Sequence, residues 1–347
     1  MAYDKPPCTH NQIDRAGKTF FNDKLGTQER ASAIAQIWNW RSAHSYPLNA
    51  IHMTLRNRAL KVDSTANTAQ RLKRLQSILR KLGRQSTMQM SQMQDLGGCR
   101  AILPGMARLN MLRFIYETSP LRHDLTRTRD YIQEPKEDGY RSVHQMYRFC
   151  GRGSSLPWDK LRIEVQLRTK LQHAWATCVE TVDAFTAEDL KFGKGTSDWR
   201  RFFQLMGTVH ARLEKTPDVP GTPNIEAELR KEVEDLEKKL GVRRMLEGFA
   251  TLTTHITRQP QSQRDWYLVQ MEPAEGRVLV RGFSTTQLKE GQRALAEAEK
   301  EYQGTRSQAV LVATANIHEL KKAYPNYFAD TGYFTTVLDR FLGRARA

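Results

Sequence analysis

The segment RIEVQLRT at residues 162–169 alternates apolar and polar side chains, and the helical pattern KLQHAWATCVETVDAF follows it directly. Alternation of period two is typical of a strand with one buried face. It places Glu164, Gln166 and Arg168 on one face and the apolar residues between them on the other. A strand that runs straight into an amphipathic helix predicts an α/β fold, with a mixed sheet flanked by helices.

Other patterns predict the remaining elements of this domain. Short apolar segments bounded by Gly, Pro or charged turns, CRAILP, DYIQEP and SVHQMYRFC, indicate further strands. The leucine-rich stretch at 71–84 predicts a helix that ends at Gly83. Apolar residues at helical spacing over 27–58, interrupted near Pro47, predict a helical lead-in.

The second half of the chain begins after the break TPDVPGTPN, where the charged segment 225–240 predicts an exposed helix. The strand-like segments DWYLVQMEP, RVLVRGFS and SQAVLVATA, with a helical pattern before the last, then predict a small α/β unit. We therefore expect a lead-in at 1–50, a main domain at 51–215, a helical connector at 216–260 and a smaller α/β domain at 261–347.

The charge balance limits the possible partners. Lys and Arg number 54 against 38 acidic residues, which leaves a formal charge of +16 and predicts a polyanionic partner. The chain has no run of roughly 18 apolar residues and begins with a polar segment, so we expect a cytoplasmic protein that does not span or bind a membrane. Its four cysteines lie far apart without ligand spacing, which predicts neither a zinc site nor disulfides.

Two carboxylates are candidates for binding a metal. Asp95 precedes a predicted strand in MQDLGGCRAIL, and Glu164 lies on another strand. Together they offer the hard oxygen ligands that Mg²⁺ prefers, with phosphate and water completing its shell. The alternatives are an Asp that caps a turn and a Glu on a hydrated strand face.

Positive charge is concentrated between Met53 and Met90, where nine Lys or Arg residues accompany one acid, Asp63. We predict that part of this set points from a helix into a cleft and holds a polyphosphate. These residues are Arg71, Lys73, Arg74 and Lys81. A solvated basic face is the alternative.

The segment RDYIQEPKEDGYRSVHQMY contains a turn imposed by Pro135 and Gly139. Such a turn would present an aromatic ring together with hydrogen-bonding groups, which suits a nucleobase and a ribose. The residues presented are Lys136, Tyr140, Ser142 and His144. An ordinary half-buried strand tyrosine and a core histidine are the alternatives.

Taken in order, RLKRLQSILRKL, QDLGGCRAIL, RDYIQEPKEDGYRSVH and IEVQLRTKLQHAWA resemble the signature segments of RelA/SpoT-type synthetases. The resemblance covers roughly residues 50 to 185. It implies transfer of the β,γ-pyrophosphate of ATP to a ribose 3′-hydroxyl, with Mg²⁺ as cofactor and AMP as leaving group. A synthetase-only form is expected, because about fifty residues precede the basic segment and His123-Asp124 has no second ligand cluster around it.

The resemblance also implies roles for individual residues. Asp95 and Glu164 would bind Mg²⁺, and Glu164, helped by Gln166, would orient or deprotonate the 3′-hydroxyl. The ATP site would consist of Arg71 and Arg108 around the adenine, with Lys73, Ser77, Lys81 and Arg100 on the phosphates. The acceptor site would consist of Lys136, Tyr140, Ser142, His144, Arg168 and His173.

Near the C-terminus, KKAYPNYFADTGYF contains Tyr324-x-x-Tyr327, and the smaller domain lacks cysteines. Both features resemble the fused toxin-antitoxin proteins called CapRel. That resemblance implies pyrophosphate transfer to the 3′ CCA end of tRNA, which blocks translation in anti-phage defence. A cysteine-free pseudo-zinc-finger domain would restrain the enzyme until a phage capsid protein binds, with both tyrosines over Arg71 and Arg108. The alternative is a turn with two packed tyrosines.

Three functions remain open from the sequence. The first is the tRNA-modifying enzyme, which the net charge favours. The second is synthesis of the free alarmone (p)ppGpp from GDP or GTP. The third is an inactive RNA-binding regulator in which Tyr140 serves as a stacking platform, although the presence of both Asp95 and Glu164 speaks against it.

Overall fold

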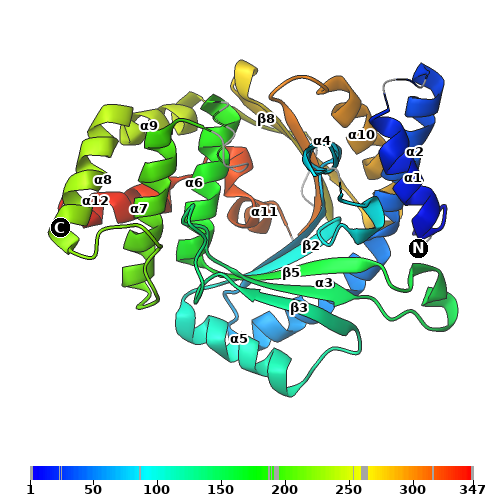
Figure 1. Ribbon diagram of the computed structural model, residues 1–347, viewed down its shortest axis with the longest axis horizontal. Coiled ribbons are helices and arrows are strands. Elements are labelled where there is room, and N and C mark those ends of the chain that lie inside the picture. Colours follow the sequence, from blue (N-terminus) through cyan, green and yellow to red (C-terminus); the bar gives the residue numbers. More distant parts are fainter. Residues whose placement is uncertain are drawn as a thin grey trace.

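The computed structural model describes residues 3–22, 24, 26–85, 87–186, 188, 190, 195–252, 254–258, 265–314 and 316–344. A mixed sheet of nine strands runs through it in the order β3-β4-β5-β2-β1-β9-β7-β8-β6 (Figure 1), which confirms the predicted mixed α/β fold. The strands are β1 Asn67–Leu72, β2 Gly97–Leu103, β3 Asp124–Asp130, β4 Val143–Arg148, β5 Arg162–Thr169, β6 Thr254–Arg258, β7 Trp266–Glu272, β8 Arg277–Phe283 and β9 Gln308–Ala313.

Helices cover both faces of the sheet because its strands bury apolar side chains on both sides. On one face, α3 (Ser45–Val62) and α5 (Met106–Thr118) pack against the strands of the first half, and α10 (Leu288–Glu301) packs against β7 and β9. On the other face lie α6 (Lys170–Thr186), α11 (Ile317–Ala323) and the short 3₁₀ helix η6 (Pro325–Phe328).

Most of the remaining helices lie at the two opposite ends of the molecule (Figure 1). α1 (His10–Phe20) and α2 (Thr27–Ala43) lie at the N-terminal end, and α4 (Leu75–Arg84) shares their core but lies closer to the middle. α7 (Ser197–Leu213), α8 (Glu226–Leu240), α9 (Val242–Leu252) and α12 (Gly332–Phe341) share a core with α6. The expected lead-in, the charged helix and the strands of the second half are therefore present.

Two predicted elements are wrong in position. The helix expected over 71–84 begins at Leu75, and Arg71 lies on strand β1 instead. The strand expected at DYIQEP, residues 130–135, is mostly a turn. The strand β3 lies before it, at residues 124–130, and ends where this segment begins. Arg71 and Lys81 consequently approach the site from a strand and a helix rather than from a single helix.

The sheet is continuous between the two halves of the chain. β9 pairs antiparallel with β1 through Gln70 opposite Ala313 and Arg71 opposite Val312. The predicted smaller domain therefore adds its strands to the sheet of the main domain. Its predicted start at residue 261 lies outside the described residues.

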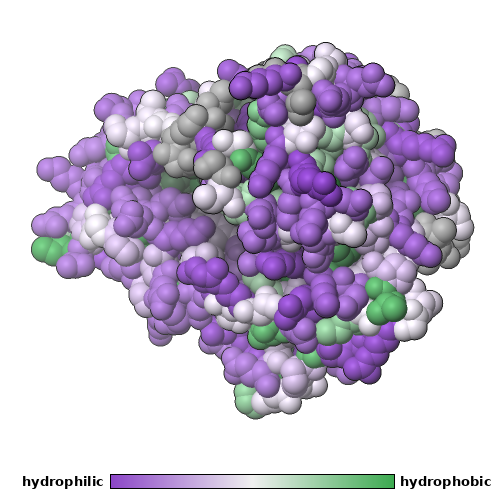
Figure 2. Space-filling model, turned by 45° about the vertical axis from the view of Figure 1, so that its right-hand side comes forward, coloured by the Kyte–Doolittle hydropathy of each residue, from purple (hydrophilic) through white to green (hydrophobic). Residues whose placement is uncertain are grey.

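The face of the molecule shown in Figure 2 is mostly hydrophilic, with hydrophobic residues in small separate spots. This agrees with a chain of which 27% is charged. Among the described residues, no helix combines the length and apolar character that a bilayer crossing requires.

Candidate active site

The candidate site lies on the sheet face that α6, α11 and η6 cover. Arg71 pairs with Gly98, which pairs with Glu164, so these residues form one row across β1, β2 and β5. Residues that face each other on neighbouring strands point to the same side of a sheet. The next row on this face adds Arg100, Gln166 and His144.

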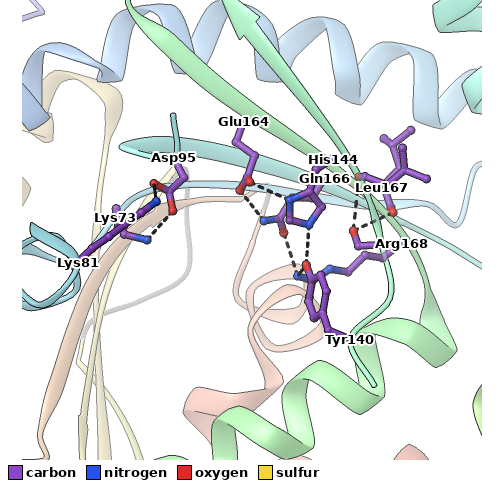
Figure 3. A network of polar contacts seen from close by, with 11 residues as sticks. Lys73, Lys81, Asp95, Tyr140, His144, Glu164, Gln166, Leu167 and Arg168 are labelled. Atoms are coloured by element: carbon purple, nitrogen blue, oxygen red, sulfur yellow. Dashed lines mark hydrogen bonds and ion pairs between the residues drawn. The ribbon is translucent and has the colours of Figure 1, made fainter. Parts of the chain in front are cut away.

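Asp95 lies in the turn before β2 and binds two lysines. Its carboxylate is 2.6 Å from Lys73 Nζ and 3.1 Å from Lys81 Nζ. Burial would raise the pKa of Asp95, but the two ammonium groups hold this pKa below its ordinary value. The carboxylate is therefore ionised, and both predicted phosphate-binding lysines already face the site (Figure 3).

Glu164 is buried on β5, with 8% of its surface exposed. His144 Nδ1 lies 2.9 Å from its Oε1, and Gln166 Nε2 donates to its Oε2 over 2.6 Å. Burial and the charge of Asp95 would raise the pKa of Glu164, but His144 and Gln166 outweigh them and lower it. The prediction that Glu164 and Gln166 share one face is confirmed.

Asp95 and Glu164 are oxygen ligands of the type that a hard divalent cation prefers. In this structure both oxygens of Asp95 are bonded to lysines, and those of Glu164 to His144 and Gln166. The charges of the two carboxylates act on one another, and Gly98 has no side chain to fill the space beside Glu164. Among the described residues, no group of three or more His, Cys, Asp or Glu could hold a metal. Two carboxylates with phosphate oxygens and water would suit Mg²⁺, which usually keeps several waters.

The predicted turn before β4 presents Tyr140 to the site. Gly139 has a φ of 93°, in the region that favours glycine. The Tyr140 hydroxyl lies 2.7 Å from His144 Nε2, and Lys136 Nζ lies 5.0 Å from the centre of the Tyr140 ring. The ring is therefore held at the edge of the site by contacts on both its hydroxyl and its face.

The two tyrosines of the YxxY segment are buried in the site. Tyr324 is 1% exposed and Tyr327 is 2% exposed. The Arg100 guanidinium lies 4.5 Å from the centre of the Tyr324 ring. Burial alone would lower the pKa of Arg71, but its neighbours, Tyr327 and Tyr324 first, outweigh burial and raise this pKa above its ordinary value. Tyr324 thus lies beside both Arg71 and Arg100, where its ring can contact guanidinium groups.

Two predicted site residues, Arg108 and Ser142, lie differently from expectation. Arg108 is half exposed on α5 and pairs with Asp63 over 3.4 Å, at the opposite end of β1 from Arg71. The register of β1 and β2 instead brings Arg100 beside Arg71. Ser142 is fully buried, and its hydroxyl donates to the Leu167 carbonyl over 3.2 Å.

One residue of the site was not predicted from the sequence. Glu180 on α6 acts electrostatically on Arg71, Arg100 and His173. Burial, together with Arg100 and Arg168, holds the pKa of His173 well below its ordinary value. Glu180 follows His173 by two helical turns, so helical periodicity could have placed both on the face that covers the site.

Comparison with known proteins identifies one segment. The family described as "Region found in RelA / SpoT proteins" matches residues 70–183, which confirms the predicted resemblance for that region. GTP pyrophosphokinase YwaC of Bacillus subtilis (strain 168) is 29% identical over 117 residues. That alignment covers 32% of this chain and 54% of YwaC, so the chain spans about half the length of this relative.

Two solved structures from Bacillus subtilis are similar in part. Small alarmone synthetase 1, bound to its product pppGpp, has a TM-score of 0.42 and 21% identity, covering 49% of this chain and 88% of its own. Small alarmone synthetase 2 has a TM-score of 0.42 and 18% identity, covering 60% of this chain and 97% of its own.

Proposed function

We propose that the chain is an ATP-dependent pyrophosphokinase that moves the β,γ-pyrophosphate of ATP to a ribose 3′-hydroxyl. The observation that carries this proposal is the meeting of two ionised carboxylates near the start of β2, one of them paired with two lysines. Phosphoryl transfer relies mainly on positioning and on charge stabilisation, which these groups provide. The match of residues 70–183 to the RelA/SpoT region supports the same reaction.

In the proposed reaction, the donor side of the site would bind the phosphates of ATP and the acceptor side would activate the 3′-hydroxyl. Bound Mg²⁺, held by Asp95 and Glu164, would neutralise charge on the phosphate oxygens. Lys73 and Lys81 would exchange Asp95 for the donor phosphates, together with Ser77 on α4. Glu164 would orient the acceptor and accept the proton of its 3′-hydroxyl. The 3′-oxygen bonds to the β-phosphorus, the bond to the α,β-bridging oxygen breaks, and AMP leaves.

The buried tyrosines support an inhibited state. An adenine bound between Arg71 and Arg100 would need the volume that Tyr324 fills. Activation would therefore require α11 and η6 to leave the sheet, and a protein that binds the C-terminal region could drive this. A phage capsid protein is the partner we propose, as in the CapRel proteins that this segment resembles.

For the acceptor, we favour the 3′ CCA end of tRNA, whose modification would block translation in the cytoplasm. A formal charge of +16 supports a nucleic acid, since phosphate contacts dominate such affinity. The alternative acceptor is GDP or GTP, and it is supported by the name of the relative YwaC, a GTP pyrophosphokinase.

One assay separates these functions. The protein is incubated with γ-labelled ATP, Mg²⁺ and, in separate reactions, tRNA, GDP or GTP. Label on tRNA supports the first function, and label on GDP or GTP supports the alternative. A failure of both the wild type and Tyr324→Ala to label any acceptor, with Glu164→Ala as the inactive control, would favour an RNA-binding regulator.

The restraint is tested in the same assay with Tyr324→Ala and Tyr327→Ala. Loss of the ring over Arg100 should raise transfer by about tenfold or more, because a desolvated cation–π contact contributes roughly 2 kcal/mol. Tyr333→Ala is the matched control, since Tyr333 is 52% exposed on α12. Equal activity of Tyr324→Ala and the wild type would contradict the inhibited state.

A further inference from the structure

Five side chains on the acceptor side of the site form a closed ring of hydrogen bonds (Figure 3). Arg168 Nη2 lies 2.6 Å from the Tyr140 hydroxyl and 3.0 Å from Gln166 Oε1. The ring closes through three further contacts: Tyr140 to His144 at 2.7 Å, His144 to Glu164 at 2.9 Å and Gln166 to Glu164 at 2.6 Å.

The chemistry of the members fixes the direction of the bonds at both charged ends of the ring. A guanidinium can only donate, and an ionised carboxylate can only accept. The Tyr140 oxygen therefore accepts from Arg168, and the Tyr140 hydroxyl shares one hydrogen with His144 Nε2. His144 carries a hydrogen on Nδ1 and donates it to Glu164, because the ionised carboxylate only accepts. In the second arm, Gln166 accepts from Arg168 and donates to Glu164.

Both arms thus begin at one nitrogen of Arg168 and end on the two oxygens of Glu164. Arg168 is 5% exposed and Glu164 is 8% exposed, so both charged ends are shielded from water. Hydrogen bonds in a low dielectric are stronger and polarise one another along a chain. The orientation of the Glu164 carboxylate is consequently set by a residue that does not touch it.

We infer that Arg168 and Tyr140, through its hydroxyl, are positioning residues for Glu164. They would couple the Tyr140 ring, which faces the nucleobase of the acceptor, to the Glu164 carboxylate. The activity readout of this inference rests on the proposed function. An arginine is required because the two hydrogens of one planar amino group serve the two arms at fixed angles. A lysine ammonium rotates freely and fixes neither.

The first test is a double-mutant cycle, with kcat and KM measured for the acceptor in the wild type and in the Tyr324→Ala background. Tyr140→Phe keeps the ring and removes one arm, so kcat should fall about tenfold while KM for the acceptor stays unchanged. Arg168→Lys should lower kcat at least as much. Tyr140→Phe should then add little in the Arg168→Lys background, because both changes break the same arm.

Additive losses in the double variant, or a change confined to KM, would overturn the inference. Tyr131→Phe is the matched control for the tyrosine, because its hydroxyl has no side-chain partner among the described residues, although its ring contacts Tyr140. Arg162→Lys, on the same strand as Arg168, is the matched control for the arginine. Both controls should keep kcat.

The second test does not depend on activity. Nitrogen-15 NMR of histidine-labelled protein should show both ring nitrogens of His144 in hydrogen bonds, Nδ1 with Glu164 and Nε2 with Tyr140. Tyr140→Phe should move the Nε2 resonance towards that of an unbonded nitrogen, whereas Tyr131→Phe should not. An unmoved resonance would refute the ring even in a fully active enzyme. If neither the wild type nor Tyr324→Ala transfers label to any acceptor, the proposed function fails while this readout still decides the inference.

Discussion

Gly139 controls how Tyr140 enters the site. A Cβ at this position would lie 2.7 Å from the Phe203 carbonyl oxygen and 3.0 Å from the Trp175 ring, and φ is 93°. Gly139→Ala should therefore lower the free energy of unfolding by about 2 to 4 kcal/mol, from both the left-handed backbone and the overlap. Denaturant unfolding at equilibrium measures this loss.

Gly153→Ala is the matched control for this prediction. Gly153 also has a positive φ, of 53°, but nothing lies within 4 Å of a Cβ there. It should lose only the backbone part, about 1 to 2 kcal/mol. Equal losses at the two positions would mean that the contacts of Gly139 with Phe203 and Trp175 do not constrain the turn.

The sequence predicts the chemical type of each site residue better than it predicts which residues lie beside it. The period of β5 was enough to place Glu164 and Gln166 on one face, because alternation is a local property of a strand. Arg108 could not be placed in this way. Which arginine lies beside Arg71 depends on the register of β1 and β2, and that register joins segments far apart in the chain.

Helix α10 fixes the position of α4, the helix that carries Ser77 and Lys81. Glu299 on α10 pairs with Arg41 over 2.6 Å and accepts a hydrogen bond from the Leu75 backbone amide at the start of α4, over 3.0 Å. The side chains of Arg41 and Glu299 are only 3% and 6% exposed. Breaking such a buried pair costs about 3 to 5 kcal/mol, so Glu299→Leu should destabilise the protein by that amount.

The comparison for Glu299→Leu is Glu297→Leu, which changes an exposed residue of the same helix. Its effect on the free energy of unfolding should stay within about 0.5 kcal/mol. Thermal and denaturant unfolding of both variants provide the measurement. A small effect at Glu299 would show that Arg41 finds another acceptor when the carboxylate is removed.

There is a physical reason why the helix predicted over residues 71–84 begins at Leu75 instead. Leu72 and Leu75 continue the helical spacing of the leucines that follow, so the local pattern extends the helix too far. In the structure, Asn67–Leu72 forms a strand because β2 pairs with it on one side and β9 on the other. Strand pairing between distant segments overrides the local preference.

The pairing of β1 with β9, which connects the two halves of the chain into one sheet, could not be predicted from the sequence. β1 pairs with β2 along six residue pairs but with β9 along only two. Each half carries its own strand and turn signals, so the sequence predicts two units. The tyrosine segment reaches the site because this short pairing sets α11 and η6 on the same face as Arg71.

Buried histidines predict how the whole molecule responds to acid. Burial is the main cause that lowers the pKa of His44 and His52 to about 4 and of His210 to about 3, and it lowers the pKa of His173 as well. In the unfolded chain each would titrate near 6.5. Between about pH 6.5 and 4 the unfolded state therefore binds more protons than the folded state, and stability falls as the pH falls.

Each of these histidines contributes about 1.4 kcal/mol per pH unit, so four together give a slope of roughly 5 kcal/mol per unit. A domain of ordinary stability, about 5 to 15 kcal/mol, would unfold within about one to three units. Denaturant unfolding at pH 7.5, 6 and 5 measures the slope. His52→Gln removes one titrating group and should reduce the slope by about 1.4 kcal/mol per unit. A stability that stays constant over this range would mean that these histidines become protonated without unfolding, and that the packing around them opens to water.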